Sequence, residues 1–179
     1  MGLEKVEGLS LYEYGKRPLD HIAGKLLEYG GIWIHSPYHQ DLLDWVIDRE
    51  VALHLLLRDP RDIIVSWAHV VEQAPKLFWN YRYNRKQLTE YNIPTRIDIL
   101  TKLLVPLMHD FDQWRQRGCF EVHHYRDIIE RPEAKDYTFN KVRGVVGSHK
   151  DEMTGKQIAK ANRLYGDIID LWSGENVTN

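Results

Sequence analysis

Arg58 and Ser66 are the two residues whose types and spacing point most directly to chemistry. Arg58 directly follows the apolar segment 51–57, and Ser66 lies in the next expected helix. The planar guanidinium of arginine fits two phosphate oxygens, and a serine hydroxyl adds a further donor. Because ligands of open α/β sheets bind at the carboxyl ends of strands, we expect an anion site here. The alternative is that Arg58 pairs with Asp62 and that Ser66 is only a small helix residue.

The elements that must position these residues alternate between strands and helices. Segment 51–57 (VALHLLL) is almost continuously apolar, which is typical of a strand buried on both faces of a parallel sheet. Asp59-Pro60 then has the sequence of a helix start, with a capping carboxylate and a proline at the first helical position. The alternation predicts an α/β fold with a largely parallel sheet, in a single domain over 1–179. The expected strands are 32–34, 51–57 and 120–125, and the expected helices are 18–29, 42–47, 59–71, 96–117 and 154–172.

Some segments are less regular. The helix expected over 96–117 contains Pro106, which predicts a kink, and Gly118 should end it. Segment 72–95 combines aromatic with basic side chains and lacks a clean period, so we expect it to be a mobile or partner-contacting surface. Segment 130–150 is expected to be mostly loop.

Further candidate site residues lie in two later segments. Tyr125 ends the strand expected over 120–125 and offers both an aromatic face and a hydroxyl. Arg143-Gly144 lies in a loop, where glycine lets backbone N–H groups approach a phosphate and arginine adds charge. The alternatives are a core tyrosine and a flexible basic surface loop.

His35 is the candidate proton acceptor. It directly follows the short strand expected over 32–34, at a carboxyl end where a site residue belongs. A neutral imidazole near pH 7 can take a proton from a hydroxyl group. His39 and His69 are its rivals.

Taken in their order along the chain, the four segments resemble the sulfotransferases of the cytosolic and bacterial type. RDPRDIIVS, from Arg58 to Ser66, is similar to the family's 3′-phosphate-binding segment, in which Arg ends a strand, an Asn/Asp-Pro-Lys/Arg-Asp turn follows and Ser closes the motif. Residues 122–129 (VHHYRDII) resemble a family strand that ends in Tyr-Glu-Asp-Leu, and 142–150 (VRGVVGSHK) resemble its Arg-Lys-Gly loop. Residues 34–37 (IHSP) resemble the Lys-x-His-x-Pro segment that holds the catalytic base. The resemblance covers about 32–172.

The resemblance implies a P-loop-NTPase-like parallel sheet flanked by helices, in a truncated or minimal version. It implies transfer of a sulfuryl group from 3′-phosphoadenosine-5′-phosphosulfate to a hydroxyl or amine of a small-molecule or glycan acceptor, without a metal. The product adenosine 3′,5′-bisphosphate would bind at the same site, and 72–95 would form part of the acceptor pocket. The implied roles are catalytic base for His35, 3′-phosphate binding for Arg58, Ser66 and Arg143, backbone contact for Gly144, and a place beside the adenine for Tyr125.

The sequence departs from the family at several positions. Arg126 stands where the family has Glu, Val142 where its loop has the first Arg, and Ile34 where a Lys precedes the His. Residues 1–31 contain no Pro-Lys-Ser-Gly-Thr type of loop, which in the family binds the 5′-phosphosulfate through backbone N–H groups, a Lys and hydroxyls. Three explanations stay open: an unusually minimal member, loss of the front of the protein, or substitution of the loop by residues 1–31.

The missing loop bears on catalysis more than on binding, so other functions compete with sulfuryl transfer. One is a degenerate, non-catalytic member that binds a phosphoadenosine nucleotide or a protein partner. Another is nucleic-acid binding through the aromatic and basic side chains of 72–95, on which bases would stack. The net charge of −2 argues against nucleic acid.

Composition adds expectations about location and partners. The single cysteine, Cys119, cannot form an internal disulfide, which predicts a reducing, cytoplasmic compartment. No apolar run approaches the ~20 residues that a membrane span needs, so we expect no membrane partner. A homo-oligomer is compatible with the sequence.

Overall fold

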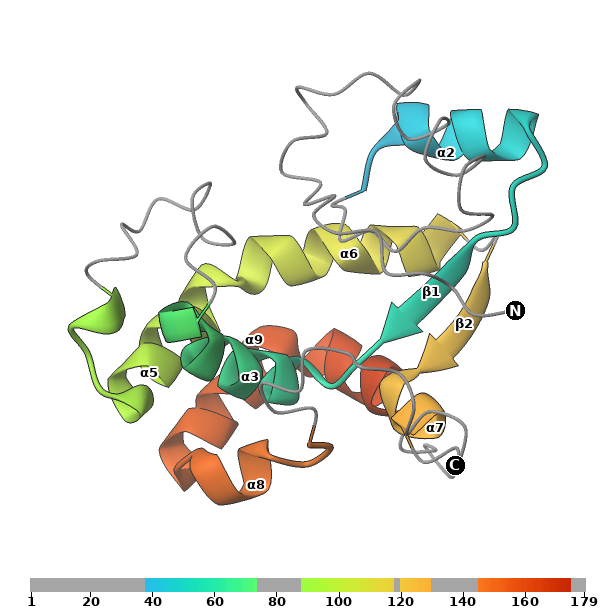
Figure 1. Ribbon diagram of the computed structural model, residues 1–179. Coiled ribbons are helices and arrows are strands. Elements are labelled where there is room, and N and C mark those ends of the chain that lie inside the picture. Colours follow the sequence, from blue (N-terminus) through green and yellow to red (C-terminus); the bar gives the residue numbers. More distant parts are fainter. Residues whose placement is uncertain (1–37, 74–87, 118–119, 130–144, 175–179) are drawn as a thin grey trace. The chain divides into compact units, whose positions relative to one another are not determined.

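The computed structural model describes residues 38–73, 88–117, 120–129 and 145–174 (Figure 1). These residues form a mixed α/β structure that is mostly helical and contains a two-stranded parallel sheet. The chain divides into two compact units, Met1–Leu53 and His54–Asn179. Within the described residues, no helix combines the length and the apolar character needed to cross a bilayer.

The described part of the first unit is the helix α2, Gln40–Asp48. It covers the helix expected over 42–47. Leu42, Leu43, Trp45 and Val46 are buried, as the spacing of an amphipathic helix requires. The guanidinium of Arg49 lies over the ring of Trp45, with Cζ 4.8 Å from the ring centroid.

The sheet of the second unit joins β1, His54–Leu57, to β2, Glu121–His124 (Figure 1). The strands are parallel, and the register pairs His54 with Glu121 and Leu57 with His124. The parallel pairing of these two segments is confirmed, although both strands are shorter than the apolar runs that predicted them. The third expected strand, 32–34, and the expected helix 18–29 lie outside the described residues.

The core of this unit lies where α3, Pro60–Gln73, packs against α5, Ile93–Leu103, and α9, Gly155–Ser173. Apolar side chains of all three helices are fully buried there, together with Leu57 of β1. The local signals for two of these helices are confirmed. The Asp59 carboxylate accepts from the N–H of Arg61 at 2.8 Å, so it caps α3. Thr154 and Gln157 form a capping box at the start of α9.

The helix expected over 96–117 is two helices, which corrects the prediction of one kinked helix. The first, α5, begins at Ile93 and ends at Leu103, and the second, α6, covers Val105–Arg117. Pro106 occupies the first turn of α6. Proline has no N–H to donate to the preceding turn and its ring clashes there, but it is tolerated where a new helix begins. Because the helix is broken at Leu104, Pro106 lies in the first turn of a new helix. In a continuous helix, its missing N–H and its ring would have disrupted the preceding turn.

Two short helices lie between β2 and α9 in the sequence. Directly after β2, the helix α7 covers Tyr125–Ile129, and α8 covers His149–Glu152. In the described part of the segment 72–95, which was expected to be a mobile or partner-contacting surface, Leu88 is fully buried in the core and α5 begins at Ile93. Residues 74–87 and 130–144 lie outside the described part of the chain.

Candidate anion site at the ends of the parallel strands

The two strand ends bring Arg58 and Tyr125 together. Arg58 follows the last residue of β1, and Tyr125 follows the last residue of β2. Because Leu57 and His124 are paired in the parallel register, the residues that follow them are neighbours. The Arg58 guanidinium lies over the tyrosine ring, with Cζ 4.7 Å from the ring centroid, within the range of a cation–π contact.

The Arg58 guanidinium has one hydrogen-bond acceptor and one unsatisfied atom. Its Nη2 donates to the carbonyl oxygen of Val145 at 3.1 Å. Its Nε is buried and has no hydrogen-bond partner among the described residues. Burial lowers the pKa of Arg58, but an arginine side chain stays charged at physiological pH. A buried, charged donor without an acceptor is costly, and such atoms need an explanation.

The two carboxylates nearest in sequence do not pair with Arg58. Asp59 instead pairs with Arg61, with an Oδ2–Nη2 distance of 2.6 Å. Asp62 binds the turn that leads into α8: its Oδ2 accepts from the N–H of Gly147 at 2.7 Å, and its Oδ1 accepts from the N–H of His149 at 3.1 Å. The ion pair between Arg58 and Asp62, which was the alternative to an anion site, is therefore not formed in the structure.

Asp62 also accepts hydrogen bonds from two side chains of the same turn. The imidazole Nδ1–H of His149 donates at 2.7 Å, and the hydroxyl of Ser148 donates at 3.3 Å. Burial alone would raise the pKa of the Asp62 carboxyl, but the hydrogen bonds from His149 and from the N–H of Gly147 hold that pKa at about 2. Asp62 is consequently an anion that anchors the turn to α3. It fixes the position of Val145, which precedes the turn and accepts from Arg58.

A pocket with cationic walls lies beside Arg58. It is small and partly open to solvent, and Arg58, Arg126 and Lys150 are among the residues that line it. The acidic lining residues, Asp59 and Asp62, already have the partners described above. The buried Arg58 Nε, which has no hydrogen-bond partner among the described residues, is the group of this pocket that would favour an anion.

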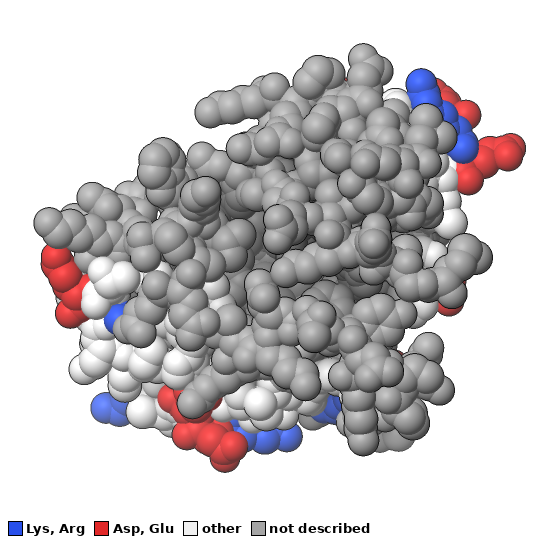
Figure 2. Space-filling model, viewed as in Figure 1, with Lys and Arg blue, Asp and Glu red and all other residues white. Residues whose placement is uncertain are grey.

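This positive charge is local to the pocket. On the face drawn in Figure 2, Lys and Arg side chains of the described residues lie among Asp and Glu side chains, and no large area of one sign is visible there. The net charge of the whole chain is −2. An anion would therefore be attracted by the pocket itself and not by a general field of the protein.

The candidate residues from the sequence fall into three groups. Arg58 and Tyr125 are in contact. Ser66 lies partly buried on α3 and is not among the described residues that line the pocket. His35, Arg143 and Gly144 lie outside the described residues.

Two residues of this site were not predicted. The sequence suggested Asp62 only as a possible partner of Arg58, and it indicated no role for His149. Their interaction joins positions 87 apart in the chain. The available signal was the pairing of a helix-start aspartate with a histidine in a glycine-containing turn, which is too common in sequences to identify a contact.

Comparisons of the chain with protein-family models, with curated proteins and with solved structures found no match. The functional argument therefore rests on the residues around Arg58 and on the motifs of the sequence.

Proposed function

We propose that this chain is a sulfotransferase-like protein that binds the 3′-phosphate of a phosphoadenosine nucleotide at Arg58. The observation that supports this proposal is the Arg58 guanidinium, which lies at the carboxyl ends of two parallel strands with a buried Nε that has no partner among the described residues. A phosphate oxygen would supply the missing acceptor. Charged hydrogen bonds of this kind are stronger than neutral ones.

Residues around Arg58 support this proposal. Tyr125 offers an aromatic ring and a hydroxyl, which in the proposal lie beside the adenine. Val145 accepts from Arg58, and it directly follows Arg143-Gly144 in the sequence. The proposal therefore includes Arg143 as a second cation and Gly144 as a backbone donor, with Ser66 as a further hydroxyl donor.

For catalysis, the proposal is sulfuryl transfer within a P-loop-NTPase-like sheet, in the cytoplasm. The acceptor hydroxyl or amine forms a bond to sulfur, and the bond between sulfur and the bridging phosphate oxygen breaks. His35 takes the proton of the acceptor, and adenosine 3′,5′-bisphosphate leaves. The acceptor belongs to a small molecule or a glycan.

The second candidate function is nucleotide binding without transfer. Residues 1–31 contain no glycine-containing loop sequence with a following Lys-Ser/Thr. Ile34 stands where the family has a lysine before the catalytic histidine. Sulfuryl transfer needs charge stabilisation at the leaving phosphate, and loss of even one well-placed donor raises a barrier by about 3–4 kcal/mol. The 3′-phosphate contacts do not depend on that loop.

Calorimetry with adenosine 3′,5′-bisphosphate tests the binding proposal. We expect Arg58→Met to weaken binding by about 1.5–3 kcal/mol, the range for a charged hydrogen bond. Arg163→Met is the matched control, because Arg163 is an exposed arginine on α9 outside the pocket. Adenosine 5′-monophosphate, which lacks the 3′-phosphate, should bind Arg58→Met and wild type equally. If the bisphosphate does not bind at millimolar concentration, the binding proposal is wrong.

A further inference from the structure

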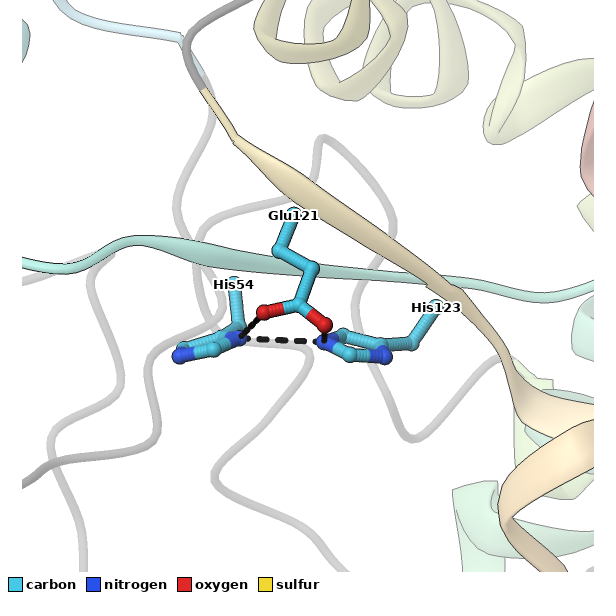
Figure 3. A group of neighbouring side chains, drawn as sticks. All are labelled: His54, Glu121 and His123. Carbon is cyan, nitrogen blue, oxygen red and sulfur yellow. Dashed lines mark hydrogen bonds and ion pairs between the residues drawn. The ribbon is translucent and has the colours of Figure 1, made fainter.

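A second group of polar side chains lies at the opposite end of the two strands from Arg58. It consists of His54 on β1 and of Glu121 and His123 on β2 (Figure 3). In Figure 3 one nitrogen of each imidazole ring points toward the other ring, and the carboxylate of Glu121 points to both of them. The side chains of His54 and Glu121 are 56% and 67% exposed, and that of His123 is 27% exposed, so the group is open to ions from solution.

The register of the sheet explains why these three residues meet. His54 is paired with Glu121, so their side chains lie on the same face. His123 is two residues after Glu121, and alternate residues of a strand point to the same face. The opposite face of β1 carries Leu57 into the core. The three polar side chains are therefore held together by the sheet backbone and do not depend on a loop.

The separations of their ligand atoms match those around a small tetrahedral cation. His54 Nδ1 is 3.0 Å from His123 Nε2. His54 Nδ1 is 3.4 Å from one carboxylate oxygen of Glu121, and His123 Nε2 is 3.7 Å from the other. Zinc–ligand bonds of about 2.0–2.1 Å at tetrahedral angles place neighbouring ligand atoms about 3.3 Å apart. One ion between the three side chains would be within bonding distance of each after small side-chain rotations.

We propose that His54, Glu121 and His123 form a binding site for a divalent transition-metal ion, of which Zn²⁺ is the best fit. The ring centroids are 5.2 Å apart, and one nitrogen of each ring points toward the other ring. Without an ion, one of these nitrogens must carry a proton for the other to accept. A metal ion satisfies both lone pairs and the carboxylate at once.

The ligand types define the class of metal. Imidazole nitrogens favour Zn²⁺ and its transition-metal neighbours, whereas Mg²⁺ and Ca²⁺ prefer sites made only of oxygen atoms. Two histidines and one glutamate supply three ligands, which leaves a fourth tetrahedral position for water or for a group of a bound molecule. The site is thus distinct in place and in charge preference from the anion pocket at the other end of the strands.

A bound ion would also stabilise the pairing of β1 with β2. His54 and His123 are 69 positions apart, so the ion would join two strands that are far apart in the chain. An ion that binds the folded and not the unfolded protein stabilises the fold by mass action. The expected effect is a melting temperature that rises with the concentration of Zn²⁺.

The test uses the full chain, first treated with a chelator and then titrated with Zn²⁺ by calorimetry. We expect one ion per chain at this site, and at least about a 10-fold loss of affinity in each of His54→Ala, His123→Ala and Glu121→Gln, since even outer-shell changes cost 10–100-fold. His109→Ala is the matched control, because His109 is an exposed histidine on α6 outside the group and should leave the affinity unchanged. X-ray absorption of the Zn²⁺-loaded wild type should show two imidazoles in the first shell.

Three results would overturn the proposal. One is Zn²⁺ binding that is the same in wild type and in the three variants. Another is a loss in His109→Ala as large as the loss in His54→Ala, which would indicate unspecific binding to surface histidines. The third is an absorption spectrum without two imidazole ligands, and because it is recorded on wild type it does not depend on the folding of any variant.

Discussion

Asp62 accepts hydrogen bonds from both the ring and the backbone N–H of His149, at 2.7 and 3.1 Å, although the two residues are 87 positions apart. Both side chains are buried. This contact holds the turn at Gly147 against the start of α3. The position of Val145, and with it the orientation of Arg58, therefore depends on a carboxylate that does not touch Arg58 itself.

Asp62→Asn should destabilise the protein through this turn. Asparagine keeps the shape and one acceptor oxygen, but it loses the charge that His149 and the N–H groups stabilise. We expect a loss of about 1–3 kcal/mol in the free energy of unfolding, measured by chemical denaturation at pH 7. Asp167→Asn, an exposed position on α9, is the control and should change stability by less than about 0.5 kcal/mol.

The same contact predicts a dependence of stability on pH. The pKa of Asp62 is lowered from 3.8 in the unfolded chain to about 2 in the folded protein. A lowered pKa adds stability that is present above the unfolded value and is lost as pH falls from about 4 toward 2. The difference in unfolding free energy between wild type and Asp62→Asn should therefore shrink by about 2 kcal/mol between pH 5 and pH 2. A difference that stays constant over this range would contradict the assignment.

Tyr125 should influence nucleotide binding through its ring more than through its hydroxyl. Its face supports the guanidinium of Arg58. Tyr125→Phe keeps this face, whereas Tyr125→Leu removes it, and a cation–π contact contributes about 0.5–2 kcal/mol. Calorimetry with adenosine 3′,5′-bisphosphate should show weaker binding in Tyr125→Leu and nearly unchanged binding in Tyr125→Phe. Equal losses in both variants would instead assign the effect to the hydroxyl.

Arg96 should be among the most sensitive residues of the core. Its side chain is buried and donates to the carbonyl oxygens of Leu88, Ala68 and Thr89 at 2.9, 3.2 and 3.1 Å. Arg96→Met keeps much of the length and leaves these acceptors without their donors, so we expect a loss of more than about 2 kcal/mol. Thermal unfolding monitored by circular dichroism measures it. Arg163→Met, at an exposed position, should unfold like wild type.

Tyr165 tests the packing of α9 on α5. The side chain is buried, and its hydroxyl donates to the carbonyl oxygen of Thr101 at 2.7 Å. Burial raises the pKa of Tyr165, so the hydroxyl keeps its proton and remains a donor at neutral pH. Tyr165→Phe should cost about 0.5–1.5 kcal/mol. Tyr91→Phe removes a hydroxyl from an exposed tyrosine and should have no measurable effect on unfolding.

Local signals in the sequence were enough for several elements. Asp59-Pro60 marks the start of α3, and Thr154 marks the start of α9, because caps are set by residues next to the helix they begin. The apolar run before Arg58 identifies β1, and its parallel partner follows from the alternation of strands and helices. The contact between Arg58 and Tyr125 agrees with the expectation that both lie at strand ends.

Other features depend on partners that are distant in the chain and were not predicted. The spacing of apolar residues is the same in one kinked helix and in two helices separated at Leu104, so the pattern does not distinguish them. The proposed metal site at His54 depends on the register between β1 and β2. A shift of β2 by one residue would move His123 to the other face of the sheet. The role of Asp62 likewise depends on a turn that the sequence places in a loop.

The position of α9 in the core has a consequence for synthesis of the protein. It is the last described helix, yet it contributes Ala161, Tyr165, Ile168, Ile169 and Trp172 to the apolar core built on α3 and α5. A growing chain leaves the ribosome from its N-terminus, so α3 and α5 emerge before the helix that covers them. Their apolar faces stay uncovered during that interval, when partly folded chains aggregate most readily. Completion of this core therefore has to wait until α9 has been made.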